Sequence, residues 1–523
     1  MSYRNQVSRR GFLKFSSMSG LSLMAWPSQS LKEPTSYNLH PDILKPGTSL
    51  LNPIPFPIDL TPAKWIWYPC GRTLQNTVIL FRKEIHISGE IAEATGYILA
   101  DSRYLLTVNG KRIQWGPAPH DPRSPEADPL DLKASLRQGR NIIASKVLFY
   151  GTGDGTWPIG NPVYYKLDIK YTNGTSETVI SDDSWNCLLA RSWKPGQFKR
   201  WFLRAFQEEF DARLYPYGWE DVQFETDKTW QKAFIYGKNG SVPVVCTGSP
   251  EYQWEIWGDA KTCSIHKRSI PMMTETVEQG FKLIESAWIE WDVPPEEYFE
   301  SVTKNAFRFN WANVSEQTGS GEWTIPVNGN KAASVTFALH EQMVGWPMFS
   351  INAPEGTIVE ILVHEAHKPG SQVMLNTHFH SWSRFICKEG LNQFETFDFE
   401  SYRWIQFHIR NYNRPVILSN IAIRRRVFPW KKLPEIHCSE PALQRLFEAS
   451  VNTLNNSAQE TVVDGMARER QQYSGDGAHQ LHAIYHGFGE TRLSARFINT
   501  FSMGLTHEGY FWIAGLHSTG WPV

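Results

Sequence analysis

The 523-residue sequence predicts a multidomain protein in which β-sandwich domains are followed by a helical region. Three observations lead to this fold class. The chain exceeds what one hydrophobic core organises, so about three or four domains are expected. Short β-rich runs separated by turn residues extend from about residue 64 to residue 430. After Pro434 the apolar residues recur with the 3.6-residue period of an α-helix.

The N-terminal segment predicts an export signal and a linker rather than folded structure. Ser8-Arg9-Arg10-Gly11-Phe12-Leu13-Lys14 resembles a bacterial twin-arginine signal. The apolar segment from Phe15 to Trp26 is too short, and too rich in Ser and Gly, to be a stable membrane anchor. We therefore assign residues 1–30 to a signal peptide and residues 31–60, with six prolines, to a linker. The expected location is the periplasm or the exterior of the cell.

The first folded domain is expected at residues 61–205 as a jelly roll. Tyr104 to Val108 read as a strand and lead into Asn109-Gly110, the strongest short signal for a β-hairpin. Together with Asp101 and the Gly139-x-Asn141 pattern, these residues resemble the galactose-binding-like domain found in many glycosidases.

Two further β-regions are expected, a linker and β-rich domain at 206–330 and a second β-sandwich at 331–430. Strands of the second sandwich are predicted at Val335–Leu339, Trp346–Ile351, Ile358–Val363 and 405–409. Because Gln406 and His408 alternate with apolar residues, the last strand is predicted to be half buried. The Arg424-Arg425-Arg426 run indicates a solvated strand end.

Composition and charge exclude several functions. With a formal net charge of −1 and no long run of one sign, the chain has no electrostatic basis for binding nucleic acid. Six separated cysteines form no C-x-x-C pair, and His364-Glu365-Ala366-His367 is one residue too short for a zinc helix, so neither a metal site nor a disulfide framework is expected. The 22 tryptophans suit both core packing and contact with sugar rings.

The helical region at 431–523 contains the candidate site. Ser439 is predicted to cap a first helix with Pro441 in its first turn, and Leu443 and Leu446 belong to its apolar stripe. Two further helices are predicted near 477–487 and 491–504. The stretch from Asp464 to Asp476 therefore falls in the loop between the first and second helices.

This loop combines residue types that suit acid/base chemistry on sugars. Its charged and aromatic residues are Asp464, Arg468, Glu469, Arg470, Tyr473 and Asp476. Glycosidic cleavage needs a protonated carboxylic acid beside the leaving oxygen and a second carboxylate. Two flanking aspartates would raise the pKa of Glu469, whereas inward-pointing arginines would lower it. We therefore predict that Arg468 or Arg470 faces away and pairs with another carboxylate.

The order of domains and this loop resemble the α-L-rhamnosidases of glycoside hydrolase family 78. The resemblance implies that residues 431–523 begin an (α/α)₆ six-hairpin toroid, with Glu469 as the general acid. It also implies a carbohydrate substrate with terminal L-rhamnose. The residues expected to bind this substrate are Asp464, Arg468, Tyr473, Asp476, Glu508 and Trp512. Tyr473 stands where many members have Trp, and Gly465-Met466 where many have Cys-Pro.

The toroid is expected to be incomplete in this chain. Only 86 residues follow from Cys438, whereas twelve helices with loops need roughly 200. The family's general base, a later Glu, is then missing, and uncovered helix stripes predict poor solubility or association. Two alternatives stay open: a non-catalytic carbohydrate-binding protein, and another (α/α)₆ glycosidase or a polysaccharide lyase. A need for calcium and the oligomeric state are not readable from the sequence.

Overall fold

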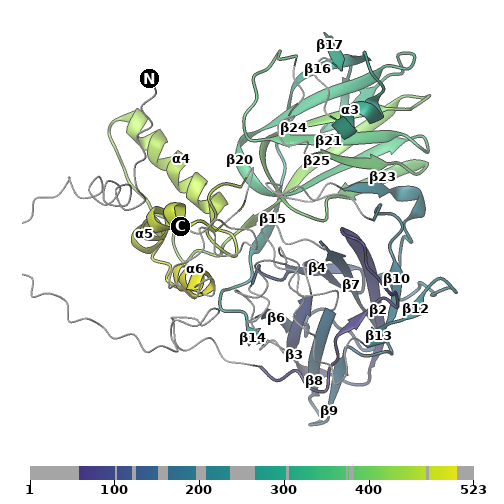
Figure 1. Cartoon of the computed structure of the whole chain (residues 1–523), viewed down its shortest axis with the longest axis vertical. Helices are drawn as coiled ribbons and strands as arrows, with labels where there is room; N and C mark the ends of the chain where they lie inside the picture. The colour runs from purple at the N-terminus through teal and green to yellow at the C-terminus, as the bar shows by residue number, and fades with distance from the viewer. Residues whose placement is uncertain are drawn as a thin grey trace, which may run out of the picture. The chain divides into compact units, whose positions relative to one another are not determined.

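The structure, a computed structural model, describes residues 58–100, 103–120, 125–150, 163–195, 208–235, 265–301, 306–372, 375, 382–466, 470 and 472–502 (Figure 1). The expected signal peptide and most of the expected linker lie outside these residues. None of the described helices is long and apolar enough to cross a membrane.

The first β-region consists of two sheets. The seven-stranded sheet contains β13 (Phe234–Ile235), β1 (Ile66–Trp67), β8 (Val163–Tyr171), β3 (Ile91–Ala100), β6 (Glu126–Asp131) and β14 (His266–Lys267) in this order, with β9 (Ser176–Ile180) beside β8. The six-stranded sheet contains β12 (Gln231–Lys232), β10 (Asn186–Leu189), β2 (Thr77–Ile87), β7 (Gly139–Phe149), β4 (Arg103–Val108) and β5 (Lys111–Gly116). A shared core of residues from both sheets joins them as a sandwich.

The six-stranded sheet is buried on both of its faces. In β2, Ile79 and Phe81 pack in the core of the sandwich, whereas Val78 and Leu80 belong to the core of the next β-region. This double burial explains why the strand is a continuous apolar run rather than an alternating one. The hairpin predicted at Asn109-Gly110 is confirmed, since both residues have positive φ, 51° and 76°, between β4 and β5.

The second β-region is one 12-stranded sheet. Its main order is β11 (Glu209–Asp211), β22 (Trp382–Ile386), β21 (Ile358–His364), β24 (Glu400–Arg410), β20 (Ala332–Ala353), β25 (Val416–Val427), β19 (Glu322–Ile325) and β18 (Glu316–Gly319). The side partners are β15 (Thr274–Glu278) on β25, β16 (Lys282–Trp291) on β17 (Phe307–Trp311) and β20, and β23 (Gly390–Glu395) on β20.

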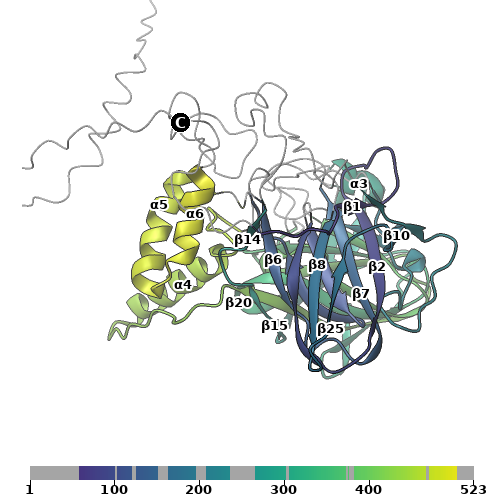
Figure 2. The ribbon, with the colours of Figure 1, turned by 90° about the horizontal axis from the view of Figure 1, so that it is seen from below.

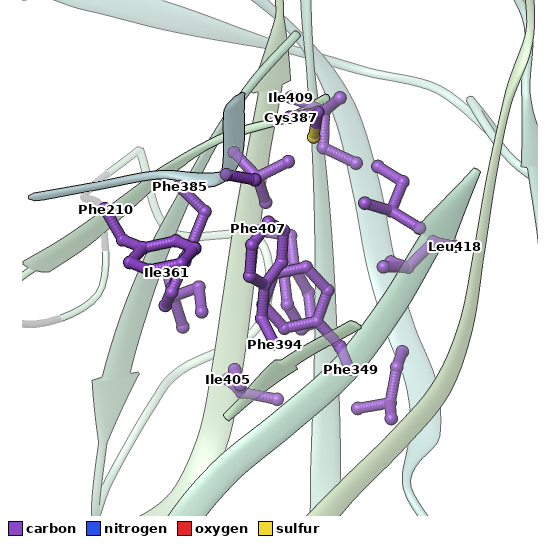
Figure 3. Close-up of a cluster of buried hydrophobic side chains, with 14 of the residues drawn as sticks. Phe210, Phe349, Ile361, Phe385, Cys387, Phe394, Ile405, Phe407, Ile409 and Leu418 are labelled. Carbon is purple, nitrogen blue, oxygen red and sulfur yellow. The ribbon is translucent and has the colours of Figure 1, made fainter. Parts of the chain in front are cut away.

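The long strand β20 lets this sheet turn around a single core. Its residues 332–338 pair with β16 and β24, whereas residues 345–353 pair with β25 and β23. Phe337 and Phe349, one from each half, both contact Phe407, with ring centroids 6.0 and 5.1 Å away. Figure 3 shows Phe349 and Phe407 in this core together with Phe385 and Phe394.

The prediction that β24 is half buried was wrong. Gln406 and His408 are 1% and 0% exposed. A second apolar cluster, containing Phe309 and Leu362, buries this face of the sheet. Gln406 Nε2 donates to Thr336 Oγ1 at 2.8 Å, and His408 Nε2 is hydrogen-bonded to Gln406 Oε1 at 2.9 Å, whereas His408 Nδ1 has no partner among the described residues.

The helices α4 (Pro441–Ser457), α5 (Ser474–Ala483) and α6 (Arg492–Ser502), with a π-turn at Ile484–Phe488, lie where the sequence predicts helices. Two smaller elements, the 3₁₀ turn at Ala212–Leu214 and α3 (Pro295–Ser301), lie earlier in the chain. Figures 1 and 2 show α4, α5 and α6 grouped together. Three helices do not establish the six-hairpin toroid, which remains a prediction.

Two details of α4 bear on the sequence predictions. The residue that caps the helix is Glu440, whose carboxylate accepts from Ala442 N, and not Ser439 as predicted. Pro441 stands at the first turn, as predicted. Leu443 and Leu446 are 55% and 62% exposed, whereas Leu454, further along the same stripe, packs against the core of the helices.

Candidate active site

The acid-rich loop joins α4 to α5, where the sequence places it. Apolar residues of the loop and of the two positions just before it pack against three parts of the fold. Val462 packs with the helices in one cluster. Val463 and Met466 pack in another cluster with Trp115 of β5 and Trp346 of β20. The loop is therefore anchored to the first sandwich and to the 12-stranded sheet as well as to its own helices.

Arg470 fixes one side of this loop. Its backbone N–H donates to Gly465 O at 3.2 Å, and its Nε donates to Met466 O at 2.9 Å. Its Nη2 donates to Phe399 O at 2.8 Å and pairs with Glu400 Oε2 at 3.1 Å. The guanidinium also lies 4.4 Å from the centroid of the Phe399 ring. The prediction that one arginine of the loop pairs with another carboxylate is confirmed.

Three of the predicted site residues lie in described parts of the structure. Asp464 is half-buried at the start of the loop, and Tyr473 stands at the N-terminus of α5. Asp476 is exposed in the first turn of α5, where a negative charge is favoured by the helix dipole. Arg468 and Glu469, in the segment 467–469, and Glu508 and Trp512, in the segment 503–523, lie outside the described residues.

Close contact between α5 and α6 sets the position of Asp476. A Cβ on Gly477 would lie 2.3 Å from Phe497 Cζ, and Phe497 is buried in the helical core. Gln472 Nε2 also donates to Phe497 O, at 2.6 Å. Glycine at 477 therefore lets the first turn of α5 approach α6.

Gly477→Ala is expected to destabilise the protein by about 1–3 kcal/mol, because the added methyl group overpacks against Phe497. Gly475→Ala is the matched control. A Cβ at Gly475 has nothing within 4 Å among the described residues, so the gain in helix propensity leaves stability unchanged or up to about 1 kcal/mol higher. Urea denaturation followed by circular dichroism measures both changes, and equal effects of the two variants would refute the close-contact explanation.

A buried charge cluster is centred on Glu460, four residues before the start of the loop. Glu460 pairs with Arg426 and lies 3.8 Å from Arg268, which pairs with Asp128 at 2.9 Å. Arg268 and Asp128 have fully buried side chains, and those of Arg426 and Glu460 are 1% and 3% exposed. Tyr104 Oη donates to Asp128 at 2.5 Å. These residues come from the first sandwich, the 12-stranded sheet and the α4–α5 connection.

A second pair extends this cluster to α6. Arg496 Nε pairs with Glu126 Oε2 at 2.9 Å, and Arg496 Nη1 donates to Glu460 O at 2.8 Å. Nearby, burial lowers the pKa of His120 to about 4, so this imidazole is neutral near pH 7. The start of β6, the residues that precede the loop and α6 are thus held together by charge-assisted hydrogen bonds.

The prediction of a solvated strand end at 424–426 was wrong. Arg424 pairs with Glu395 and Arg425 with Glu341, with arginine side chains 22% and 17% exposed. Arg426 is buried, and its guanidinium lies 4.3, 4.9 and 5.4 Å from the rings of Phe399, Trp115 and Trp346. Arg426 Nε and Nη1 have no hydrogen-bond acceptor among the described residues. The cation–π contacts with these rings stabilise the guanidinium in place of those hydrogen bonds.

Sequence reasoning missed Glu400 and Glu460. Glu400 is 70 residues from Arg470, and Glu460 is 34 residues from Arg426. The one local signal was the position of Glu460 just before Val462-Val463, where a carboxylate beside apolar residues suggests a buried, paired group. Among the described residues, no group of three or more His, Cys, Asp or Glu side chains is arranged to hold a metal ion.

The described structure places two β-regions before three helices, with an acid-rich loop between the first two of these helices, and this arrangement defines the class of the protein. Residues 89–247 match the family model of the alpha-L-rhamnosidase N-terminal domain. No curated protein matches the sequence.

Solved structures of rhamnosidases share this fold. The glycoside hydrolase family 78 rhamnosidase of Bacillus sp. GL1 is 17% identical, with a TM-score of 0.69 over 84% of this chain and 63% of its own. The α-L-rhamnosidase of Dictyoglumus thermophilum is 16% identical, with a TM-score of 0.59 over 86% of this chain and 45% of its own. The Streptomyces avermitilis enzyme, complexed with L-rhamnose, is 17% identical, with a TM-score of 0.60 over 84% and 37%.

The resemblance to family 78 is thereby confirmed: residues 89–247 match the model of its N-terminal domain, and the fold is shared with its solved structures. The chain spans less than two thirds of the length of each of these three structures.

Proposed function

We propose that the protein is an exported glycoside hydrolase that releases terminal α-L-rhamnose from glycans or glycosides by inverting acid/base hydrolysis. The observation that carries this proposal is the acid-rich loop, held between two helices and against both β-regions of a rhamnosidase fold. The proposed export depends on the twin-arginine pattern at Ser8–Lys14.

In this proposal Glu469 is the general acid that protonates the leaving oxygen. Asp464 and Asp476 bracket it in the sequence and either bind sugar hydroxyls or orient the acid. Their negative charge favours the protonated form of Glu469. The pairing of Arg470 with Glu400 supports this role, because it directs one positive charge of the loop toward another carboxylate.

L-Rhamnose as the released sugar is supported by the Streptomyces avermitilis structure, which is a complex with that sugar. Arg468, Tyr473, Glu508 and Trp512 are the proposed substrate contacts. The proposal assigns the acid half of the reaction only, and no residue among the described ones is assigned as the base that activates water.

Release of 4-nitrophenol from 4-nitrophenyl α-L-rhamnopyranoside by the purified 523-residue protein tests this function. Proton NMR of the first product should detect β-L-rhamnose, since inversion of an α-glycoside produces the opposite anomer. Binding of the rhamnoside without any release would favour the non-catalytic carbohydrate-binding alternative. An unsaturated uronate released from acidic polysaccharides would favour a lyase.

A further inference from the structure

A separate pocket lies on the second β-region, at the far end of β24 from the acid-rich loop. It has a volume of about 550 Å³, within the usual range for small-molecule sites. Its walls include Trp291 at the end of β16, Asn330 and Lys331 before β20, and Arg410 and Asn411 at the end of β24. Figure 1 shows α3, whose first residue Pro295 also lines the pocket, beside β16 and β17 of this sheet.

The pocket is remote from the loop because the two lie at opposite ends of the same strand, β24. Glu400, which pairs with Arg470 of the loop, is the first residue of β24, and Arg410 is the last. At about 3.4 Å per residue, ten steps along a strand separate them by about 34 Å. A ligand in this pocket would therefore not touch the loop.

The polar groups of the pocket are held in fixed positions. Arg410 is 12% exposed, and its Nη2 pairs at 2.9 Å with both Glu360 and Glu296. The backbone of Asn411 is left-handed, at φ 60°, and its Nδ2 donates to Gly356 O at 2.7 Å. Such a preorganised arrangement lowers the entropic cost of binding a polar ligand.

The charges favour an uncharged ligand. The two cations, Lys331 and Arg410, are already paired, Lys331 with Glu290 at 2.7 Å. Glu355 adds a further carboxylate to the wall. Glu360 also pairs with Arg384 at 3.2 Å, and both cations of the lining are already paired, so an anionic ligand would have to compete with their carboxylates, which disfavours phosphates and acidic sugars.

The remaining lining suits a sugar. Asn330, Asn411 and Asn413 place three side-chain amides around the pocket, and an amide both donates to and accepts from hydroxyl groups. The ring of Trp291 packs against Tyr298 and Phe307, each 5.7 Å away between centroids, and gives one wall an aromatic surface.

We propose that this pocket is an auxiliary binding site for a neutral sugar unit of a glycan, distinct from the acid-rich loop. It would hold the protein on a glycan chain while another part of that chain reaches the loop. The proposal does not depend on hydrolysis by the loop, so a protein without turnover still tests it.

Calorimetric titration with methyl α-L-rhamnopyranoside, methyl β-D-galactopyranoside and methyl α-D-glucopyranoside tests the site, with D-galacturonate as the charged comparison. At least one neutral glycoside is expected to bind saturably with a Kd of about 0.1–10 mM. Asn330→Trp, which fills the pocket from an exposed position, should weaken binding at least tenfold. Asn352→Trp, the same change at an exposed position of β20 outside the pocket, should leave it unchanged.

Asn413→Trp fills the same pocket from another loop and provides a second variant if Asn330→Trp does not fold. Absence of saturable binding by any of the three neutral glycosides would overturn the proposal, and so would unchanged affinity in both pocket variants. Loss of binding in Asp476→Asn would also overturn it, because the sugar would then bind at the acid-rich loop. Preferred binding of galacturonate would contradict the charge argument.

Discussion

Glu460→Ala is expected to lower the free energy of unfolding by about 3–5 kcal/mol, the cost of removing one partner from a buried ion pair. The variant leaves the guanidinium groups of Arg426 and Arg268 in a region where their side chains are 1% and 0% exposed. Arg268 keeps Asp128, but the other groups around Arg426 are mainly aromatic rings. Denaturation in urea, followed by tryptophan fluorescence, measures the change.

The control for this variant is Glu93→Ala. Glu93 pairs with Lys170 at 2.9 Å, but the two side chains are 47% and 62% exposed, so the change should cost less than about 1 kcal/mol. A loss of stability in Glu460→Ala as small as that in Glu93→Ala would contradict a buried charge cluster that joins the β-regions to the helices.

The effect of Glu460→Ala should depend on pH. Burial alone would raise the pKa of Glu460, but the nearby charges of Arg426, Arg268 and Arg103 outweigh it and lower the pKa from 4.5 to about 2. A carboxyl group with a lowered pKa contributes stability that is present above pH 4.5 and is lost as the pH falls toward 2. The difference between wild type and variant should therefore be full at pH 6 and shrink below pH 4.5.

Glu208, which is present in both the wild type and Glu460→Ala, changes stability with pH in the opposite direction from Glu460. Burial raises its pKa from 4.5 to about 8, although Trp193 Nε1 and two backbone N–H groups donate to it. Stability from this group is present below pH 4.5 and is lost as the pH rises through 8. Comparing wild type with Glu460→Ala at each pH cancels this common contribution.

Local patterns account for what could be predicted of the fold. The Asn109-Gly110 turn is determined by two residues that tolerate positive φ, and the helices follow from a period that is visible within about ten residues. The burial of Gln406 and His408 could not be predicted in this way, because it depends on residues such as Phe309 and Leu362 that pack over the same face of the sheet.

In the candidate site too, local features could be predicted from the sequence, whereas long-range partners could not. The position of the loop between two helices, and the need for an arginine of the loop to pair elsewhere, follow from local periodicity and from the charges within thirteen residues. The identity of that partner, Glu400, is set by how β24 meets the loop. The burial of Arg426 likewise depends on Trp115 and Phe399 from two different β-regions, and no periodicity in its own strand indicates it.

Glu469→Gln is expected to lower kcat for 4-nitrophenyl α-L-rhamnoside by about 10²–10⁴-fold, the usual contribution of general acid–base catalysis, with KM changed less than threefold. Glutamine keeps the size and hydrogen-bonding capacity of the side chain but has no proton to transfer. Glu448→Gln, the same change on the exposed surface of α4, should leave both constants unchanged. Initial rates over a range of pH would also lose the limb that reports ionisation of the acid.

The leaving group distinguishes an acid catalyst from a residue that only supports the loop. A 2,4-dinitrophenolate departs without protonation, so Glu469→Gln should recover most of its lost rate on the dinitrophenyl rhamnoside. Gly477→Ala would act through the position of the loop and should slow both substrates in the same proportion. An equal loss of rate on both substrates in Glu469→Gln would therefore remove Glu469 from the role of general acid, even if the protein proves to be a rhamnosidase.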